Sequence, residues 1–390
     1  MKENKEKLWS RDFIIISISY FFLASSFSLL MPTIPIFLSK ELGVETSKIG
    51  IVLSSYVIAL LMFRPFSGFI VDIYSRKPLL ILGVSLFVAT FFGYYFAATV
   101  LFLILLRFLH GIFWGMATVS SNTVAIDIIP ASRRAEGIGF FGVNSNIAMA
   151  IAPYIAVNIY NRFGFHALIT ASLVMGVFSI VAVTLIKVPI RKKLDETPPI
   201  SIDRFILLKG LPIFWNQLFI SFGWGTLVAF AVLYGIDIGL QNSGIFFLFL
   251  ALGLVLSRIN SGKLVDKGHL HIVMQVALLL ITIGFLTFAS FHSIYMFCVA
   301  AFLIGLGYGT LFPALQSIYV NMAPSSQRGT ANSTYLTGFD VGISLGMLVG
   351  AYFVEKYSFS FMYNMTACLS FIAIFIYRFN SIRVYERNRL

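Results

Sequence analysis

The chain repeats a pattern of its rarer residues after about 194 positions, which is close to half of its 390 residues. The pairs that share this offset are Arg64 and Arg258, Ser67 and Ser261, Gly68 and Gly262, Asp72 and Asp266, Gly111 and Gly305, Gly115 and Gly309, Pro130 and Pro324, Ser132 and Ser326, and Arg134 and Arg328. One constant register across so many positions is not expected by chance in a chain rich in Leu, Ile and Phe. The repeat therefore predicts two equivalent structural units in tandem.

The composition indicates that lipid surrounds most of the chain. Hydrophobic residues make up 58% of the sequence and charged residues 11%, and the mean hydropathy is +0.90. A soluble domain carries roughly a quarter charged residues. Apolar stretches close to the ~20 residues that cross a bilayer as a helix recur along the chain. We predict twelve of them, at about 13–38, 47–71, 79–97, 101–129, 138–160, 166–188, 212–236, 243–265, 271–291, 294–322, 330–354 and 358–377.

The predicted helices divide evenly about the repeat, so the sequence predicts an all-α integral membrane protein of two six-helix repeats. A membrane β-barrel is excluded because its strands would be shorter and would alternate in hydropathy. The one break in the apolar pattern contains Pro189, Pro198 and Pro199. We therefore predict an N-terminal six-helix bundle at 1–188, a cytoplasmic linker at 189–211 and a C-terminal six-helix bundle at 212–390.

The net charge of +12 is distributed as expected for a membrane protein and not for a nucleic-acid-binding one. With both termini in the cytoplasm, most Lys and Arg residues fall in cytoplasmic segments. The predicted outer loops hold Lys40, Lys48, Arg162 and Lys356. This asymmetry follows the positive-inside rule, so we expect a multi-pass protein of the plasma membrane, of bacterial origin, with both termini cytoplasmic. The two cysteines fall inside predicted spans, which argues against a disulfide framework or a thiolate metal site.

Three segments of the first repeat resemble motifs of the major facilitator superfamily. The loop after the second predicted span reads Gly68-Phe-Ile-Val-Asp72-Ile-Tyr-Ser-Arg76-Lys77 and is similar to the family's signature loop. The fourth span carries Arg107-Phe-Leu-His110-Gly111, similar to an Arg-x-x-Gln-Gly motif with His at the Gln position. The stretch from Pro130 to Gly137 resembles the loop that follows. The exporter motif of the fifth span is present only in a softened form, Ala148-x-x-x-Ala152-Pro153.

The resemblance implies a transporter of the drug and metabolite branch, sugar-efflux-like members included. We expect a proton-coupled exporter of a small polar, anionic or zwitterionic metabolite or drug-like compound that works by alternating access, as a monomer in the lipid bilayer. An uptake symporter for an organic anion or a sugar is a second reading. A transport-inactive membrane sensor or assembly partner is a third, from a different class. Neither an enzymatic activity nor a metal or other cofactor is expected, because no ligand cluster, nucleophile–base pair or phosphate-binding loop is found.

One acidic residue, Asp340, is predicted to lie deep in the membrane. It stands about ten residues into the eleventh span, or ~15 Å along the helix. Helical periodicity places Ser333, Thr337 and Ser344 on the same face. Because a low dielectric disfavours the charged form of an acid, a carboxyl group at that depth can load and release a proton near neutral pH. We therefore expect Asp340 to couple transport to protons, with His110 as the second candidate.

A polar stripe on the fourth predicted span forms the first candidate wall of a substrate site. Arg107, His110 and Trp114 share one face of that helix, and Asn122 lies at its edge. A guanidinium group, an imidazole and an indole ring on one face would suit an anionic or zwitterionic substrate. The other candidate substrate-binding residues are Asn146, Gln217, Trp224 and Gln316.

A second cluster is expected at the cytoplasmic ends of the helices. By resemblance to the family, an acid there accepts helix-terminal N–H groups of the opposite half and pairs with basic residues, so that the cytoplasmic side stays shut. The residues that we assign to this cytoplasmic gate are Arg64, Gly68, Asp72, Arg76, Asp127 and Arg133.

Overall fold

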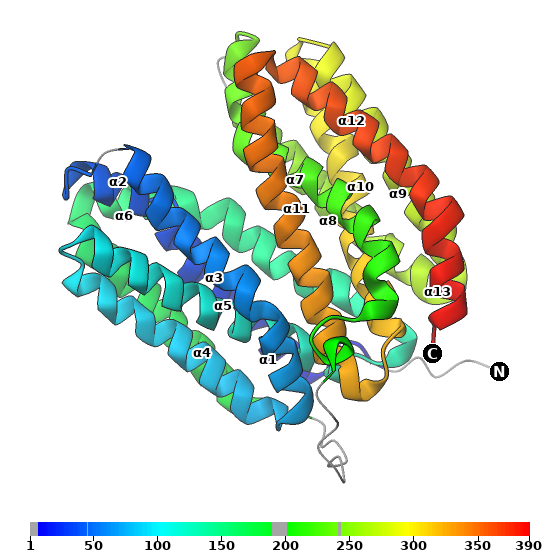
Figure 1. Cartoon of the computed structure of the whole chain (residues 1–390), viewed down its shortest axis with the longest axis horizontal. Helices are drawn as coiled ribbons and strands as arrows, with labels where there is room; N and C mark the ends of the chain where they lie inside the picture. Colours follow the sequence, from blue (N-terminus) through cyan, green and yellow to red (C-terminus); the bar gives the residue numbers. More distant parts are fainter. Residues whose placement is uncertain (1–6, 45, 189–200, 241–242) are drawn as a thin grey trace. The chain divides into compact units, whose positions relative to one another are not determined.

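The computed structural model describes residues 7–44, 46–188, 201–240 and 243–390, and the regular structure of these segments is helical (Figure 1). The long helices are α1 (Arg11–Leu30), α3 (Thr46–Ile73), α4 (Arg76–Gly93), α5 (Val100–Ile128), α6 (Arg134–Leu185), α7 (Leu211–Asp237), α8 (Ile245–Leu264), α9 (Leu270–Ser290), α10 (Ile294–Asn321), α11 (Arg328–Lys356) and α12 (Phe359–Ile376). Two short helices, α2 (Ile34–Lys40) and α13 (Ile382–Asn388), extend α1 and α12. The first part of the predicted linker, up to residue 200, lies outside the described segments.

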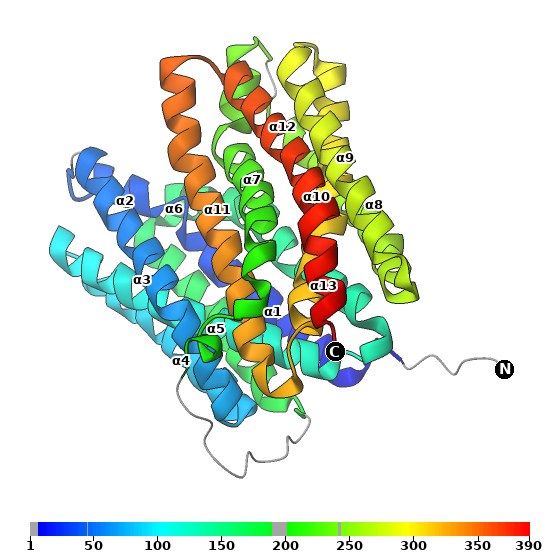
Figure 2. The same ribbon diagram turned by 45° about the vertical axis from the view of Figure 1, so that its right-hand side comes forward.

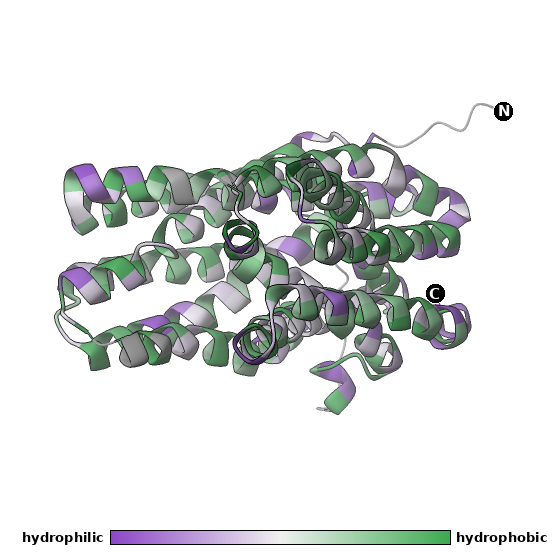
Figure 3. Cartoon of the chain, turned by 90° about the horizontal axis from the view of Figure 1, so that it is seen from above, coloured by the Kyte–Doolittle hydropathy of each residue, from purple (hydrophilic) through white to green (hydrophobic). Residues whose placement is uncertain are grey.

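Ten helices in the described part of the chain are long and apolar enough to cross a membrane, judged by length and composition. Two glycines with positive φ divide the longest helical stretches. Gly164 (φ 81) interrupts α6, which therefore consists of two helices, and Gly268 (φ 91) separates α8 from α9. With these breaks the chain has the predicted twelve-helix, all-α membrane fold. Figure 3 shows hydrophobic residues along most of the helix surfaces.

The repeat in the sequence is also a repeat in the structure. The Thr99 hydroxyl accepts a hydrogen bond from Phe102 N at the start of α5, and the Ser293 hydroxyl accepts one from Met296 N at the start of α10. Such caps satisfy backbone donors that the first helical turn leaves free. Since Thr99 and Ser293 stand about 194 positions apart, the two repeats begin equivalent helices in the same way.

Equivalent glycines let equivalent helices pack closely. A Cβ atom on Gly111 of α5 would lie 2.3 Å from the Tyr56 carbonyl oxygen of α3. A Cβ atom on Gly305 of α10 would lie 2.2 Å from the Leu250 carbonyl oxygen of α8. Both distances are shorter than any real contact, so only glycine fits at these two positions. Helices α8 and α10 lie side by side in both views of the ribbon (Figures 1 and 2).

The chain forms two compact units. Each unit contains most of one half of the sequence and one short segment from the other half. The first unit comprises Met1–Pro130, Phe141–Ile206 and Ser326–Ser333. The second comprises Ala131–Phe140, Leu207–Ser325 and Thr334–Leu390. The first unit therefore includes the beginning of α11, and the second includes the beginning of α6.

The replacement of Gly346 by valine should lower the stability of the second unit. A Cβ atom on Gly346 of α11 would lie 2.1 Å from the Phe222 carbonyl oxygen of α7, so the two helices must move apart. Overpacking of this kind costs about 1–3 kcal/mol. We expect a lower melting temperature for Gly346→Val in detergent. Gly139→Ala is the matched control, because its Cβ atom would meet Pro313 at an ordinary 3.7 Å. An equal melting temperature for both variants would contradict the close packing of α7 and α11.

Candidate functional site

Arg107 of α5 is a fully buried cation in the first unit. Its Nη2 atom lies 3.4 Å from the Met31 sulfur, and its guanidinium carbon lies 4.6 Å from the centre of the Tyr56 ring. Within the described residues, Nε and Nη1 have no hydrogen-bond partner. A sulfur atom is a weak acceptor and an aromatic face offsets only part of the cost of burying a charge. The guanidinium group is therefore left with unused donors.

His110 lies one turn further along α5 and is also fully buried. Its Nδ1 atom is 3.1 Å from the Tyr94 hydroxyl, while Nε2 has no partner in the part of the chain that the structure describes. The Phe87 and Phe91 rings of α4 lie 4.5 and 4.9 Å from the imidazole centre. His110 thus has one oriented nitrogen and one unused nitrogen within an aromatic cage.

The same face of α5 continues with Trp114 and Asn122. Trp114 is half-buried and stacks on Phe27 of α1, with ring centres 4.3 Å apart and planes 18° apart. Asn122 is buried and donates to the Thr118 carbonyl oxygen at 2.9 Å. Asn146, on α6, is half-buried. Arg107, His110 and Trp114 therefore lie on one face of α5 within the first unit, with Asn122 at its edge, and we call this face the Arg107 wall.

The candidate binding residues of the second unit are polar groups in a packed interior. Gln217 of α7 is fully buried and donates to the Ser221 hydroxyl at 3.1 Å, and its Oε1 atom has no partner among the described residues. Trp224 packs edge-on against Tyr308 and Phe312 at 5.1 and 5.5 Å. Gln316 of α10 is buried. Trp224 is thus part of an aromatic packing cluster, whereas Gln217 keeps a free acceptor.

Asp340 of α11 is half-buried, as are Thr337 and Ser344 on the same face. The opposite face of the helix packs on α7, because Gly342 and Gly346 closely approach Ser221 and Phe222. At about 100° per residue, Asp340 is turned by about 160° from Gly342 and by about 120° from Gly346. The polar face of α11 is therefore directed away from α7.

Asp72, near the C-terminal end of α3, binds the beginning of α11. Its two carboxylate oxygens accept hydrogen bonds from Gly329 N and Thr330 N, both at 2.7 Å. We call these three residues the first latch. A carboxylate is favoured at a helix N-terminus by free N–H groups and by the helix dipole. The first latch therefore connects the N-terminal repeat to a helix of the C-terminal repeat, within the first unit.

Ion pairs surround the first latch. Arg76 is buried and pairs with Asp127 and, at 3.5 Å, with Asp72. Arg328, the first residue of α11, pairs with Asp127 at 2.8 Å. Asp127 thus bridges two arginines, one from each repeat.

Two further gate candidates lie against α11. The Ser333 hydroxyl donates to the Arg64 carbonyl oxygen at 2.6 Å, and the Arg64 guanidinium group lies 3.4 Å from the Thr118 hydroxyl. A Cβ atom on Gly68 would lie 2.6 Å from Ser333 Cβ. The backbone of α3 therefore reaches α11 only because residue 68 is glycine.

A second latch, which the sequence prediction did not include, has the same geometry. Asp266 accepts hydrogen bonds from Ala135 N at 2.9 Å and Glu136 N at 3.0 Å, at the beginning of α6. We call these three residues the second latch. Ala135 and Glu136 stand at the repeat positions of Gly329 and Thr330. Because the offset links both the acids and their partners, the repeat in the sequence was the signal that could have predicted this site.

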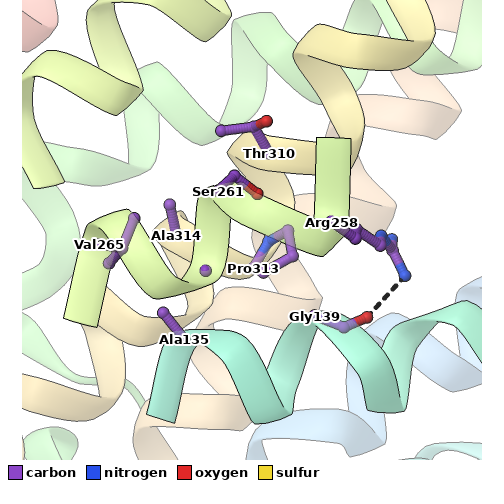
Figure 4. A pocket seen from close by; sticks show the side chains of 9 residues that line it. Ala135, Gly139, Arg258, Ser261, Val265, Thr310, Pro313 and Ala314 are labelled. Atoms are coloured by element: carbon purple, nitrogen blue, oxygen red, sulfur yellow. Dashed lines mark hydrogen bonds between the residues drawn. The ribbon is translucent and has the colours of Figure 1, made fainter. Parts of the chain in front are cut away.

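The surroundings of the second latch are equivalent in position but differ in charge. Arg134, equivalent to Arg328, donates to the Asn321 side-chain oxygen at 2.6 Å, and Asn321 stands at the position of Asp127. Arg258, equivalent to Arg64, donates to the Gly139 carbonyl oxygen at 2.9 Å (Figure 4). The pocket in Figure 4 is lined mainly by backbone and small apolar groups, so we assign no ligand to it.

Arg133, a predicted gate residue, lies beside the second latch. Its guanidinium group pairs with Glu136 at 2.7 and 2.8 Å, within the second unit. The hydrogen bond to Glu136 raises the pKa of Arg133, so the guanidinium group stays charged. In the described segments, no group of three or more His, Cys, Asp or Glu side chains is arranged to hold a metal ion.

Comparisons with known proteins agree with this architecture. A family model described as Major Facilitator Superfamily matches residues 16–274 and 259–389. The multi-drug resistance efflux pump PmrA of Streptococcus pneumoniae is 25% identical over 94% of this chain and 95% of its own length. The staphylopine export protein of Staphylococcus aureus is 25% identical over 84% of this chain and 86% of its own. The crystal structure of the human organic anion transporter MFSD10 superposes with a TM-score of 0.78 at 16% identity, covering 94% and 98% of the two chains.

Proposed function

Because the chain belongs to the Major Facilitator Superfamily, we propose that it exports small polar, anionic or zwitterionic compounds by alternating access, in exchange for protons. Family membership makes it a multi-pass membrane transporter and not an enzyme. Relatives that are efflux pumps support export as the direction of transport. We expect a monomer in the cytoplasmic membrane of a bacterium, with both termini inside.

The observation that carries the proposed substrate class is the unsatisfied guanidinium group of Arg107. A buried cation with unused hydrogen-bond donors lowers the stability of the protein unless an anion binds to it. The neighbouring aromatic rings and the unused nitrogen of His110 offer further contacts to a polar molecule. Asn122 and Asn146 are the proposed additional contacts in the first unit. Gln217, Trp224 and Gln316 are the proposed substrate-binding residues of the second unit.

Proton coupling is proposed to reside at Asp340. An acid within a predicted span is expensive and usually marks an ion or substrate path. Its half-buried position on a polar helix face supports exchange of a proton with water. His110 is the second candidate, since its Nε2 atom has no partner among the described residues.

The two latches are proposed to control the conformational cycle. Each acid belongs to one repeat and accepts N–H groups from a helix of the other, so the repeats cannot separate at their cytoplasmic ends until these bonds break. Alternating access requires such separation. The latches are therefore proposed as the cytoplasmic gate.

Transport by membrane vesicles tests the proposed function. A panel of labelled metabolites is offered to inverted and right-side-out vesicles under an imposed pH gradient. We expect inverted vesicles that are acidic inside to accumulate at least one anionic or zwitterionic compound. Accumulation only in right-side-out vesicles with an acidic exterior would instead indicate an uptake symporter.

The replacement of Arg107 should weaken substrate binding. Hydrogen bonds to a charged group contribute about 1.5–3 kcal/mol. We therefore expect Arg107→Ala to raise the half-saturating substrate concentration by roughly ten- to a hundredfold. Arg107→Lys should not restore the substrate affinity, because an ammonium group cannot reproduce the planar arrangement of the guanidinium N–H donors. Full activity of Arg107→Ala in the vesicle assay would reduce the residue to a role in packing.

A further inference from the structure

We propose that the ligand of the Arg107 wall is an aromatic carboxylate, and that its carboxylate takes the place of the Met31 side chain at the guanidinium group. This inference rests on the proposed function and specifies the substrate class of the same site. It concerns only residues of the first unit: Arg107 and Trp114 of α5, Tyr56 of α3, and Phe27 and Met31 at the end of α1.

The charge on Arg107 requires an anion. Its Nη2 atom contacts the Met31 sulfur at 3.4 Å, and a thioether is a poor substitute for a carboxylate oxygen. Nε and Nη1 have no partner among the residues that the structure describes. An arginine side chain with free N–H groups in a dry site binds a carboxylate through charge-assisted hydrogen bonds. A neutral sugar would leave the charge uncompensated, and a cation would be repelled.

The Met31 side chain is free to move aside at this site. It follows the last residue of α1, before Pro32, and it is 36% exposed although Arg107 beneath it is fully buried. Methionine is unbranched and adapts to irregular spaces at little cost. A change in its side-chain rotamers would therefore expose the guanidinium group without any movement of the helices.

The rings beside Met31 favour an aromatic group next to the carboxylate. Phe27 lies one turn before Met31 on α1 and stacks on Trp114, and both are half-buried. The Tyr56 ring, which covers Arg107, lies 5.3 Å from Phe27. A flat ring bound beside Arg107 would extend this stack, whereas a saturated ring of similar size would not.

The test is equilibrium binding to the full-length protein in detergent. The probes are phenylacetate, phenylacetamide and cyclohexylacetate, which differ in the charge or in the ring. Calorimetry measures their affinities, and quenching of tryptophan fluorescence gives a second readout. We expect phenylacetate to bind at least about tenfold more tightly than the amide, and cyclohexylacetate to bind more weakly than phenylacetate.

Two variants locate the binding site. Arg107→Gln should abolish the preference for the acid over the amide. Met31→Ala should bind phenylacetate at least as tightly as the unmodified protein, because the ligand takes the place of the Met31 side chain. Met31→Ala also serves as the test if Arg107→Gln does not fold. The proposal is overturned if phenylacetate shows no saturable binding, if the preference for the acid survives in Arg107→Gln, or if Met31→Ala weakens the binding of phenylacetate.

The result of this binding test can be distinguished from the result of the transport test of the proposed function. If phenylacetate binds as described but no vesicle accumulates any compound under a pH gradient, the proposed transport fails and the aromatic carboxylate site stands. If gradient-driven export is found but the acid and the amide bind equally, the site assignment fails and the transport function stands.

Discussion

Asp340→Asn should abolish accumulation driven by a pH gradient while leaving the protein folded and able to exchange substrate passively. Asparagine has nearly the shape of aspartate but no proton to exchange, and asparagine already stands at the equivalent position of the first repeat, Asn146. Asp340 lies half-buried on the polar face of α11, where a carboxyl group can reach water in one state and lose it in another. The measurement is substrate accumulation in inverted vesicles at several pH values from about 5.5 to about 8, on either side of neutrality.

Matched variants separate the loss of coupling from general damage. Asp340→Glu keeps an exchangeable proton and should retain part of the accumulation. Asp237→Asn removes an exposed acid at the end of α7 and should behave as the unmodified protein does. If Asp340→Asn accumulates substrate normally across the whole pH range, coupling does not depend on this residue. The same experiment on His110→Gln then tests the second candidate.

The fold could be predicted from the sequence because it depends on patterns that are visible along the chain. Long apolar stretches and a constant offset between repeats predicted the all-α membrane architecture of two repeats. The detailed surroundings of Arg107 were not predictable in this way. Met31 reaches Arg107 because α1 ends beside it, and no periodicity along the chain indicates that contact.

The individual contacts of the gate residues were less predictable. Arg133 was assigned to the gate from its position near the predicted cytoplasmic end of a helix. The structure pairs it with Glu136, since a short turn at Ala131–Arg133 directs it to the beginning of α6. The partners of Asp72 are about 260 residues away, so only the resemblance to a family suggested where they lie. The offset between repeats then gives the second latch directly.

Asp72→Asn should increase hydrogen exchange at the first latch more than Asp266→Asn does at the second. In both variants a charged acceptor of two N–H groups becomes a neutral one with a single acceptor oxygen, and each charge-assisted bond contributes about 1.5–3 kcal/mol. At the first latch, Asp72 also pairs with Arg76, which in turn pairs with Asp127. At the second, Leu270 replaces Arg76 and Asn321 replaces Asp127. Exchange at Gly329–Thr330 and at Ala135–Glu136 is measured by mass spectrometry.

The two substitutions should also separate transport rate from substrate affinity. Because neither acid belongs to the Arg107 wall, we expect each variant, like Arg76→Ala, to change the transport rate strongly and the binding affinity less than severalfold. Asp12→Asn is the matched control, since Asp12 also accepts a backbone hydrogen bond, from Lys187 N, but within one repeat. Asn321→Asp adds the missing charge beside Arg134 and should slow exchange at Ala135–Glu136. Loss of substrate binding in Asp72→Asn, or equal exchange at both latches, would contradict the assignment, because a gate must govern the passage between states and not the affinity of either one.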